Sequence, residues 1–137
     1  MQIKYCNIFI FFILINTIDL EAYMMHHVKP DKEWKEENLP PFDELILSWN
    51  GIRPIEGKHF FYIRVKIHEW SSWFLYAVWG KDNQSCFLTS APDAHIRIYQ
   101  DTLEVLEGKK ATAFEIKIVQ EGNASLDNIR HLHVYTN

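Results

Sequence analysis

Apolar and polar residues alternate along most of the chain from Phe42 onwards. In the clearest run, residues 59–68, the side chains at positions 61, 63, 65 and 67 are apolar and those between them are mostly polar. Successive side chains of a β-strand point to opposite faces of a sheet, so this alternation predicts strands with one buried face. No segment shows a helical period, and the sequence therefore predicts an all-β fold.

The alternating runs predict about seven strands, at residues 43–50, 59–68, 72–80, 84–90, 94–106, 111–120 and 128–136. Short strands separated by glycine, proline, asparagine and aspartate are typical of a sandwich or barrel. We expect residues 42–137 to form a single antiparallel β-sandwich, either jelly-roll or fibronectin-like. In the fifth run the apolar positions change parity between Ile98 and Leu103, which predicts a bulge or bend near Gln100 and Asp101.

The first 41 residues have a different character. Lys4 precedes an uninterrupted apolar run at residues 8–15, and Ala22 offers a small residue before a cleavage site. This arrangement is typical of a secretory signal, and the run is too short to span a bilayer. We expect residues 1–22 to be a signal peptide and residues 23–41 a flexible, charged tail or linker that contains proline. The mature protein would be secreted, or held in the cell envelope or periplasm, with no transmembrane helix.

Charge and cysteine content exclude some partners. The chain has 14 Lys and Arg against 18 Asp and Glu, a formal net charge of -4. Nothing in the sequence is a basic patch, so we expect no nucleic-acid partner. Of the two cysteines, Cys6 lies in the predicted signal peptide, which leaves Cys86 alone and allows no internal disulfide in the mature chain.

Four of the five tryptophans lie between residues 45 and 79. The run 72–80 is apolar at both parities, which predicts a central strand that is covered on both sides or lines a groove. Aromatic rings on an open face can stack on sugars, whereas the same rings on a covered face simply build the core. The candidate ligand-binding residues are Trp70, Trp73, Tyr76, Trp79, Tyr62, Arg64, Arg97 and Tyr99, with Glu115, Lys117, His131 and His133 as further outward-facing groups.

Metal binding has one candidate site in a strand. His131 and His133 are two positions apart and lie on one strand face, a spacing that suits zinc or copper if His68, His95 or Asp101 supplies further ligands. The alternative is a pair of exposed strand histidines. Met24-Met-His-His27, near the expected new N-terminus, is a further copper-binding candidate. We expect no metal and no cofactor.

No catalytic motif stands out. Cys86 with His59, His68 or His95 would form a minimal thiol dyad, but no recognisable motif flanks the cysteine, and a lone strand cysteine is usually a small buried hydrophobe. The sequence contains no glycine-rich phosphate loop, zinc-finger spacing or hydrolase elbow. It therefore predicts no catalytic residues, and an enzyme in its own right ranks third among the functional hypotheses.

Six short motifs occur in an order and spacing that resemble a known family. They are Phe42–Asn50 (FDELILSWN), Arg53–Pro54, Trp70–Trp73 (WSSW), Ala77–Gly80 (AVWG), Tyr99–Leu103 (YQDTL) and Ala111–Lys117 (ATAFEIK). Together they resemble the β-sandwich module that precedes the catalytic domain in secreted bacterial papain-like peptidases of the bacteriocin-processing family, family C thirty-nine. The resemblance covers residues 42–137 and includes no catalytic Cys and His, so it implies the accessory module without the enzyme.

These observations favour a secreted, non-catalytic binding module. It would recognise cell-wall or other extracellular glycan through the aromatic residues between Trp70 and Trp79. The alternative is a protein–protein docking module that pairs with a separate peptidase or an envelope protein. Exposed edge strands favour that alternative, because a sandwich without its partner domain leaves a docking surface bare.

Overall fold

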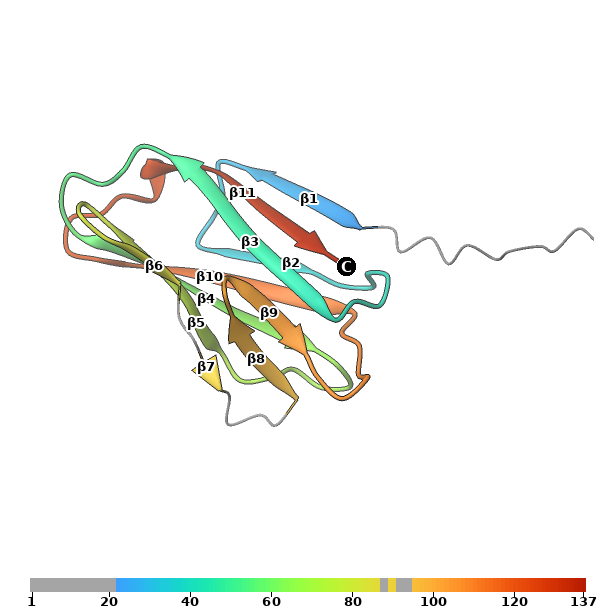
Figure 1. Cartoon of the computed structure of the whole chain (residues 1–137). Coiled ribbons are helices and arrows are strands. Elements are labelled where there is room, and N and C mark those ends of the chain that lie inside the picture. The colour runs from blue at the N-terminus through green and yellow to red at the C-terminus, as the bar shows by residue number, and fades with distance from the viewer. Residues whose placement is uncertain (1–21, 87–88, 91–94) are drawn as a thin grey trace, which may run out of the picture.

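Two antiparallel sheets face each other in a computed structural model of the chain, which describes residues 22–86, 89–90 and 95–137 (Figure 1). The all-β prediction is therefore confirmed in its coarse form. The predicted signal peptide lies outside the described residues except for Ala22. Within the described part of the chain, no helix has the length and apolar character needed to cross a membrane.

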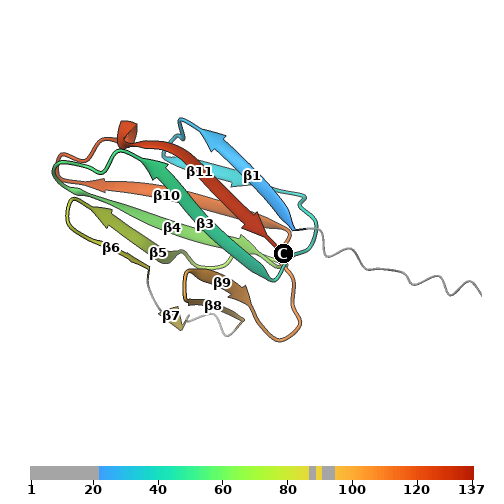
Figure 2. The same ribbon diagram turned by 45° about the horizontal axis from the view of Figure 1, so that its top comes forward.

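The first sheet has six strands. In spatial order they are β1 (Tyr23–Val28), β11 (Ile129–Thr136), β3 (Glu44–Gly51), β9 (Thr102–Val105), β8 (Ile96–Tyr99) and β7 (Thr89–Ser90). Strand β11, which is last in the sequence, lies between β1 and β3, as the tilted view shows (Figure 2). This sheet therefore joins the beginning and the end of the described chain.

The second sheet has five strands. In spatial order they are β2 (Glu33–Glu36), β10 (Ala113–Glu121), β4 (Lys58–Lys66), β5 (Phe74–Gly80) and β6 (Gln84–Cys86). A short 3₁₀ helix, η1 (Leu126–Asn128), precedes β11. Strand β5 has a neighbour on each side, as its apolar character at both parities predicts.

The hydrophobic core lies between the sheets and follows the alternation in the sequence. Along β4, Phe61, Ile63 and Val65 are buried, whereas the residues between them remain partly exposed. Buried residues of both sheets form a single cluster, which includes Leu45, Leu47, Leu132 and Val134 from one sheet and Phe61, Ile63, Phe114 and Ile116 from the other. Each sheet thus buries one face and keeps most of the other open, except along β5, where both faces are largely buried.

Two of the predicted strands are each divided in the structure. The run 94–106 becomes the hairpin β8–β9, in which Gln100 and Asp101 have φ values of 47° and 63°. Two consecutive residues in the left-handed region make a tight turn between antiparallel strands, so the bend lies where the parity change predicts it. The run 84–90 contributes β6 to one sheet and β7 to the other, and residues 87–88 lie outside the described part. The described residues form eleven strands rather than seven.

The expectation of a flexible tail over residues 23–41 is wrong. Strand β1 pairs along its length with β11, and β2 pairs with β10. Trp34 in β2 is buried and lies edge-on to Phe114, with ring centroids 5.2 Å apart. The charged residues on either side of Trp34 point outward, so a strand of four residues gives too short an alternation to be recognised in the sequence.

Candidate functional site

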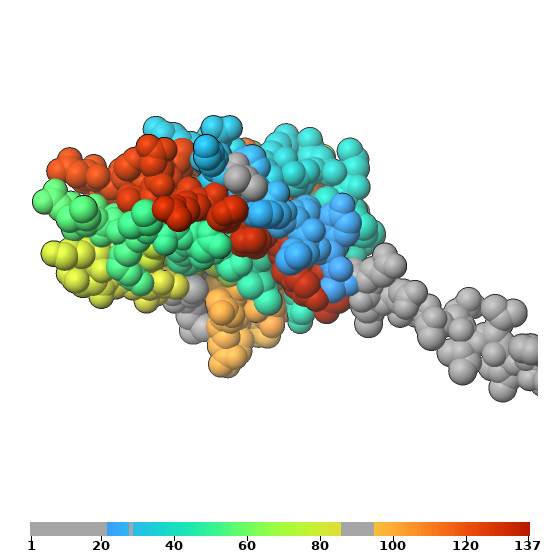
Figure 3. Space-filling model, turned by 90° about the horizontal axis from the view of Figure 1, so that it is seen from above, coloured from blue at the N-terminus to red at the C-terminus, as the bar shows by residue number. Residues whose placement is uncertain are grey.

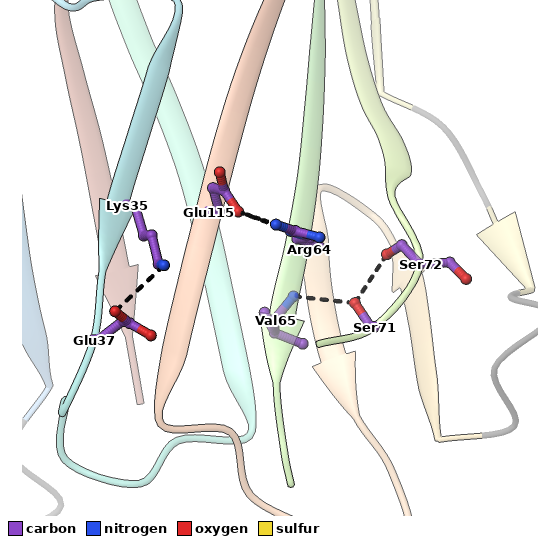
Figure 4. A network of polar contacts seen from close by, with 7 residues as sticks. All are labelled: Lys35, Glu37, Arg64, Val65, Ser71, Ser72 and Glu115. Carbon is purple, nitrogen blue, oxygen red and sulfur yellow. Dashed lines mark hydrogen bonds and ion pairs between the residues drawn. The ribbon is translucent and has the colours of Figure 1, made fainter. Parts of the chain in front are cut away.

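The segment between β4 and β5 holds two tryptophans on the outer face of the five-stranded sheet. The Ser71 N–H donates to the Val65 carbonyl at 2.8 Å, and the Val65 N–H donates to Ser71 Oγ at 3.1 Å. Ser71 Oγ in turn donates to the Ser72 carbonyl at 2.9 Å (Figure 4). These bonds fold the segment back along β4, so that both Trp70 and Trp73 lie close to the Arg64 guanidinium.

Aromatic rings and cations alternate across this face. The guanidinium carbon of Arg64 lies 4.8 Å from the ring centroid of Trp70 and 4.6 Å from that of Trp73. Lys117 Nζ lies 4.6 Å from the Trp73 centroid and 5.6 Å from that of Tyr62. Lys35 Nζ lies 5.3 Å from the Trp70 centroid. All of these separations are in the range of cation–π attraction. We call these six residues the tryptophan–cation row: Lys35, Trp70, Arg64, Trp73, Lys117 and Tyr62.

Strand register brings the members of the row together. Glu115 of β10 lies opposite Lys35 of β2 on one side and Arg64 of β4 on the other. Two residues further along β10, Lys117 lies opposite Tyr62. Since β10 and β4 bury their alternate residues, the members of the row that they supply must face outward. The row therefore depends on three strands and on the β4–β5 segment.

Carboxylates neutralise part of the positive charge in the row. Glu115 accepts from Arg64 Nε at 2.8 Å and lies 2.6 Å from Nη2, and the two side chains are 13% and 28% exposed. Lys35 pairs more loosely with Glu37 at 3.3 Å (Figure 4). Among the described residues, no carboxylate forms an ion pair with Lys117. Lys117 lies opposite Glu33 of β2 without forming an ion pair with it, so Lys117 is the cation of the row that no carboxylate of the described residues holds in place.

An open cavity of about 360 Å³ lies beside Trp70. Its lining residues are Ile67, His68, Glu69, Trp70, Ser71, His95 and Lys109. His95 Nδ1 lies 2.9 Å from a carboxylate oxygen of Glu107. The cavity combines one indole ring with imidazole, ammonium and hydroxyl groups, which is a composition able to orient a polar ligand.

The predicted ligand-binding residues divide among three places. Tyr62, Arg64, Trp70 and Trp73 come together in the tryptophan–cation row. Arg97 and Tyr99 lie on β8, in the other sheet, where the Arg97 guanidinium lies 5.6 Å from the Tyr99 ring centroid and forms an ion pair with Glu104. They therefore belong to a different face of the protein.

Tyr76 and Trp79 lie in the core, and the expectation that they share an open face with Trp70 is wrong. Tyr76 is fully buried and Trp79 is 5% exposed, in contact with the rings of Trp49 and His59. The register of β5 against β4 shifts between Phe61 and Tyr62, which inserts one extra residue on β5. This bulge breaks simple alternation, so the sequence parity does not separate the two faces of β5.

Histidines gather on the outer face of the other sheet. Strand β11, red in Figure 3, lies between β1 and β3 and carries His131 and His133. The ring centroid of His26, on β1, lies 4.9 Å from that of His131 and 4.4 Å from that of His133, and His26 Nε2 lies 2.7 Å from His131 Nδ1. Burial, and then the charges of His26 and His131, lower the pKa of His133.

The three imidazole rings are stacked rather than directed at a common point. Within the ranges that the structure describes, no group of three or more His, Cys, Asp or Glu side chains is arranged to hold a metal ion. The suggested extra ligands lie elsewhere, because His68 and His95 line the cavity beside Trp70 and Asp101 is in the β8–β9 turn. The Met24–His27 motif is divided as well, since His27 stacks on the buried Trp34.

The thiol dyad stays untested, because only its candidate histidines have described side chains. His59 is fully buried, and burial lowers its pKa although a contact with Asn128 at 3.4 Å raises it. His68 and His95 lie at the Trp70 cavity. The side chain of Cys86 is outside the part that the structure describes.

Two residues of these clusters were not predicted from the sequence. Lys35 and His26 both lie in the segment expected to be a tail, so neither was considered as a partner for the strands of the domain. Trp34 does stand out in the sequence, because it is a tryptophan surrounded by charged residues, and such a residue can mark a strand or an anchor to the core.

No family model, curated protein or solved structure shows a significant match to the chain.

Proposed function

We propose that this chain is a secreted, non-catalytic binding module whose ligand surface is the tryptophan–cation row, and that its ligand is a cell-wall or other extracellular glycan. We also propose that the fold is a jelly-roll or fibronectin-like sandwich and that it is related to the accessory module of the bacteriocin-processing peptidases. The observation that carries it is the fixed position of Trp70 and Trp73 on the outside of the sheet.

Holding indole rings on an outer face has an energetic cost. Burial of a large apolar side chain contributes about 1.5–3 kcal/mol, and a partly exposed tryptophan forgoes some of that. Here the chain keeps Trp70 and Trp73 partly exposed and uses both the N–H and the hydroxyl of Ser71 to keep them there. Tryptophans of this kind, with an apolar ring and a polar edge, are enriched where proteins bind other molecules.

The surroundings of the rings suit a polar ligand with flat apolar patches. Arg64, Lys117 and Glu115 supply donors and acceptors within the row, and the cavity beside Trp70 adds His68 and Ser71. Sugar rings have the same combination of apolar faces and surrounding hydroxyl groups. A glycan is therefore the extracellular ligand that this surface fits best.

The test is a binding comparison between variants of the two sheet faces. We expect Trp70→Ala/Trp73→Ala to lose retention on peptidoglycan sacculi and in affinity gels that contain soluble polysaccharides. Tyr99→Ala, on the opposite sheet, should bind like the wild type. Thermal unfolding must be cooperative in both variants. If the double variant does not fold, Trp73→Phe keeps the packing and should still weaken binding. Unchanged retention in the tryptophan variants would contradict the proposal.

A further inference from the structure

We infer that the glycan is acidic, and that the cations of the tryptophan–cation row bind its carboxylate, phosphate or sulfate groups. This inference rests on the proposed function, because it specifies the ligand of the same surface. It concerns the chemical class of the ligand, which the position of the rings alone leaves open.

The faces of the rings are already in contact with cations. Trp73 has Arg64 and Lys117 each 4.6 Å from its ring centroid, and Trp70 has Arg64 at 4.8 Å and Lys35 at 5.3 Å. A neutral sugar that stacks on either indole must displace a cation, and it offers no charge to compensate for the lost attraction. Flat stacking of a neutral sugar is therefore disfavoured on this surface.

The same contacts prepare the cations for an anion. A free lysine or arginine loses much side-chain entropy when it is immobilised on a ligand, and a side chain that is already held loses less. Arg64 lies close to two indoles and is fixed further by Glu115. Lys117 lies between Trp73 and Tyr62 and forms no ion pair with a carboxylate in the described part of the chain. The row thus presents a pre-positioned positive group.

Further lysines extend the positive surface past the row. Lys66, two residues after Arg64 on β4, forms an isolated bridge with the backbone of Trp70, and Lys109 lines the cavity beside that ring. Neither ammonium forms an ion pair among the residues described. On the opposite sheet the matching cation, Arg97, is paired with Glu104.

The charge of the whole chain narrows the choice of polyanion. The formal net charge of -4 repels any polyanion at long range, so the local positive surface acts at short distance. A glycan with spaced acidic groups meets the cations of the row one at a time and places sugar hydroxyls against the cavity. The observations therefore favour an acidic polysaccharide over nucleic acid.

The experiment uses three polymers that share one backbone: dextran, carboxymethyl-dextran and dextran sulfate. Biolayer interferometry should detect saturable binding of the protein to the two charged polymers, weakening as salt is added, and at least about ten-fold weaker binding to dextran. Equal binding to neutral dextran, or no binding to either charged polymer, would overturn the inference. Poly-L-glutamate carries carboxylates but no sugar, so it tests whether the sugar itself is recognised. If the protein bound it as tightly as carboxymethyl-dextran, recognition of a glycan would be overturned.

Two arginines provide a matched pair of variants. Arg64 and Arg97 each pair with a glutamate on the neighbouring strand and each lie over an aromatic ring, but on opposite sheets. We expect Arg64→Gln to weaken binding to carboxymethyl-dextran about ten-fold and Lys117→Gln about two- to five-fold, with Arg97→Gln unchanged. Equal losses in Arg64→Gln and Arg97→Gln would show a general charge effect and overturn the inference.

The inference and the proposed function fail in different ways. Binding of neutral glycans that is lost in Trp70→Ala/Trp73→Ala but kept in Lys117→Gln would uphold the binding surface and overturn the acidic ligand. Binding of charged dextrans that is unaffected by the tryptophan variants and by Lys117→Gln would place the ligand elsewhere and overturn both.

Discussion

Replacing Tyr76 with phenylalanine tests how the two sheets are joined. The Tyr76 hydroxyl projects from β5 across the core and accepts from the Leu47 N–H at 3.1 Å. It also contacts the backbone carbonyls of Leu47, at 3.2 Å, and of Asp101. Strand β9 pairs with β3 only as far as Ile46 and Thr102, so the hydroxyl takes up the next N–H of β3 where that pairing stops.

The expected loss follows from the groups left without a partner. Phenylalanine keeps the ring and creates almost no cavity, but the buried Leu47 N–H loses its hydrogen bond, and the carbonyl of Asp101, an exposed turn residue, loses one that water can replace. A buried backbone group without a partner costs about 1–3 kcal/mol. We therefore expect Tyr76→Phe to lower the free energy of unfolding by about 1–3 kcal/mol, a substantial part of the stability of a domain this size.

Urea unfolding measures this change directly. The midpoint should fall while the slope of free energy against urea stays the same, because the surface exposed on unfolding is unchanged. Tyr99→Phe is the matched control: its side chain is 45% exposed, and we expect a change within about 0.5 kcal/mol. A Tyr76→Phe variant as stable as the wild type would refute the assigned role of the hydroxyl.

Three further predictions concern the N-terminal strands, the tryptophan segment and pH. Trp34→Ala should lower the free energy of unfolding in urea by about 3–5 kcal/mol, because Trp34 packs against Phe114 in the core. A small loss would contradict the conclusion that the segment around Trp34 is part of the folded domain. Ser71→Ala should cost about 1–3 kcal/mol and weaken the near-ultraviolet circular dichroism of the indoles, whereas Ser72→Ala, which keeps its carbonyl, should do neither. Because burial lowers the pKa of His59 in the folded state, its contribution to stability is complete above its ordinary pKa of about 6.5 and is lost as the pH falls below it. His59→Gln should therefore flatten the fall in stability between neutral and acidic pH, measured by urea unfolding at several pH values.

Local alternation was sufficient to predict much of the fold. In β4 and β10 one parity is apolar and the other polar, so the buried residues Phe61, Ile63 and Ile116 could be identified before the structure was known. The turn at Gln100 and Asp101 was located from a change of parity alone. These features depend only on residues that are close together in the sequence, so they can be recognised without knowledge of the fold.

The features that were missed depend on pairings between distant segments or on irregular backbone. Trp34 stands out among charged residues in the sequence, but its strand does not, because β2 is stabilised by pairing with β10, about 80 residues later. Trp79 shares the sequence parity of Trp73, but the extra residue of β5 between Leu75 and Ala77 changes the parity and turns Trp79 toward the core. Trp70, Trp73 and Arg64 were predicted as members of one surface, but the contact of Arg64 with both indoles depends on the return of the Ser71 segment to β4.

The most direct test of the tryptophan–cation row as the ligand surface is a titration followed by the indole N–H signals in ¹H–¹⁵N NMR spectra. The signals can be assigned with single tryptophan-to-phenylalanine variants, and carboxymethyl-dextran serves as the ligand. We predict saturable shifts for Trp70 and Trp73 and almost none for Trp34 and Trp79, which are buried in the core. Shifts confined to Trp34 or Trp79, or a spectrum that does not change as the polymer is added, would contradict the assignment of this surface.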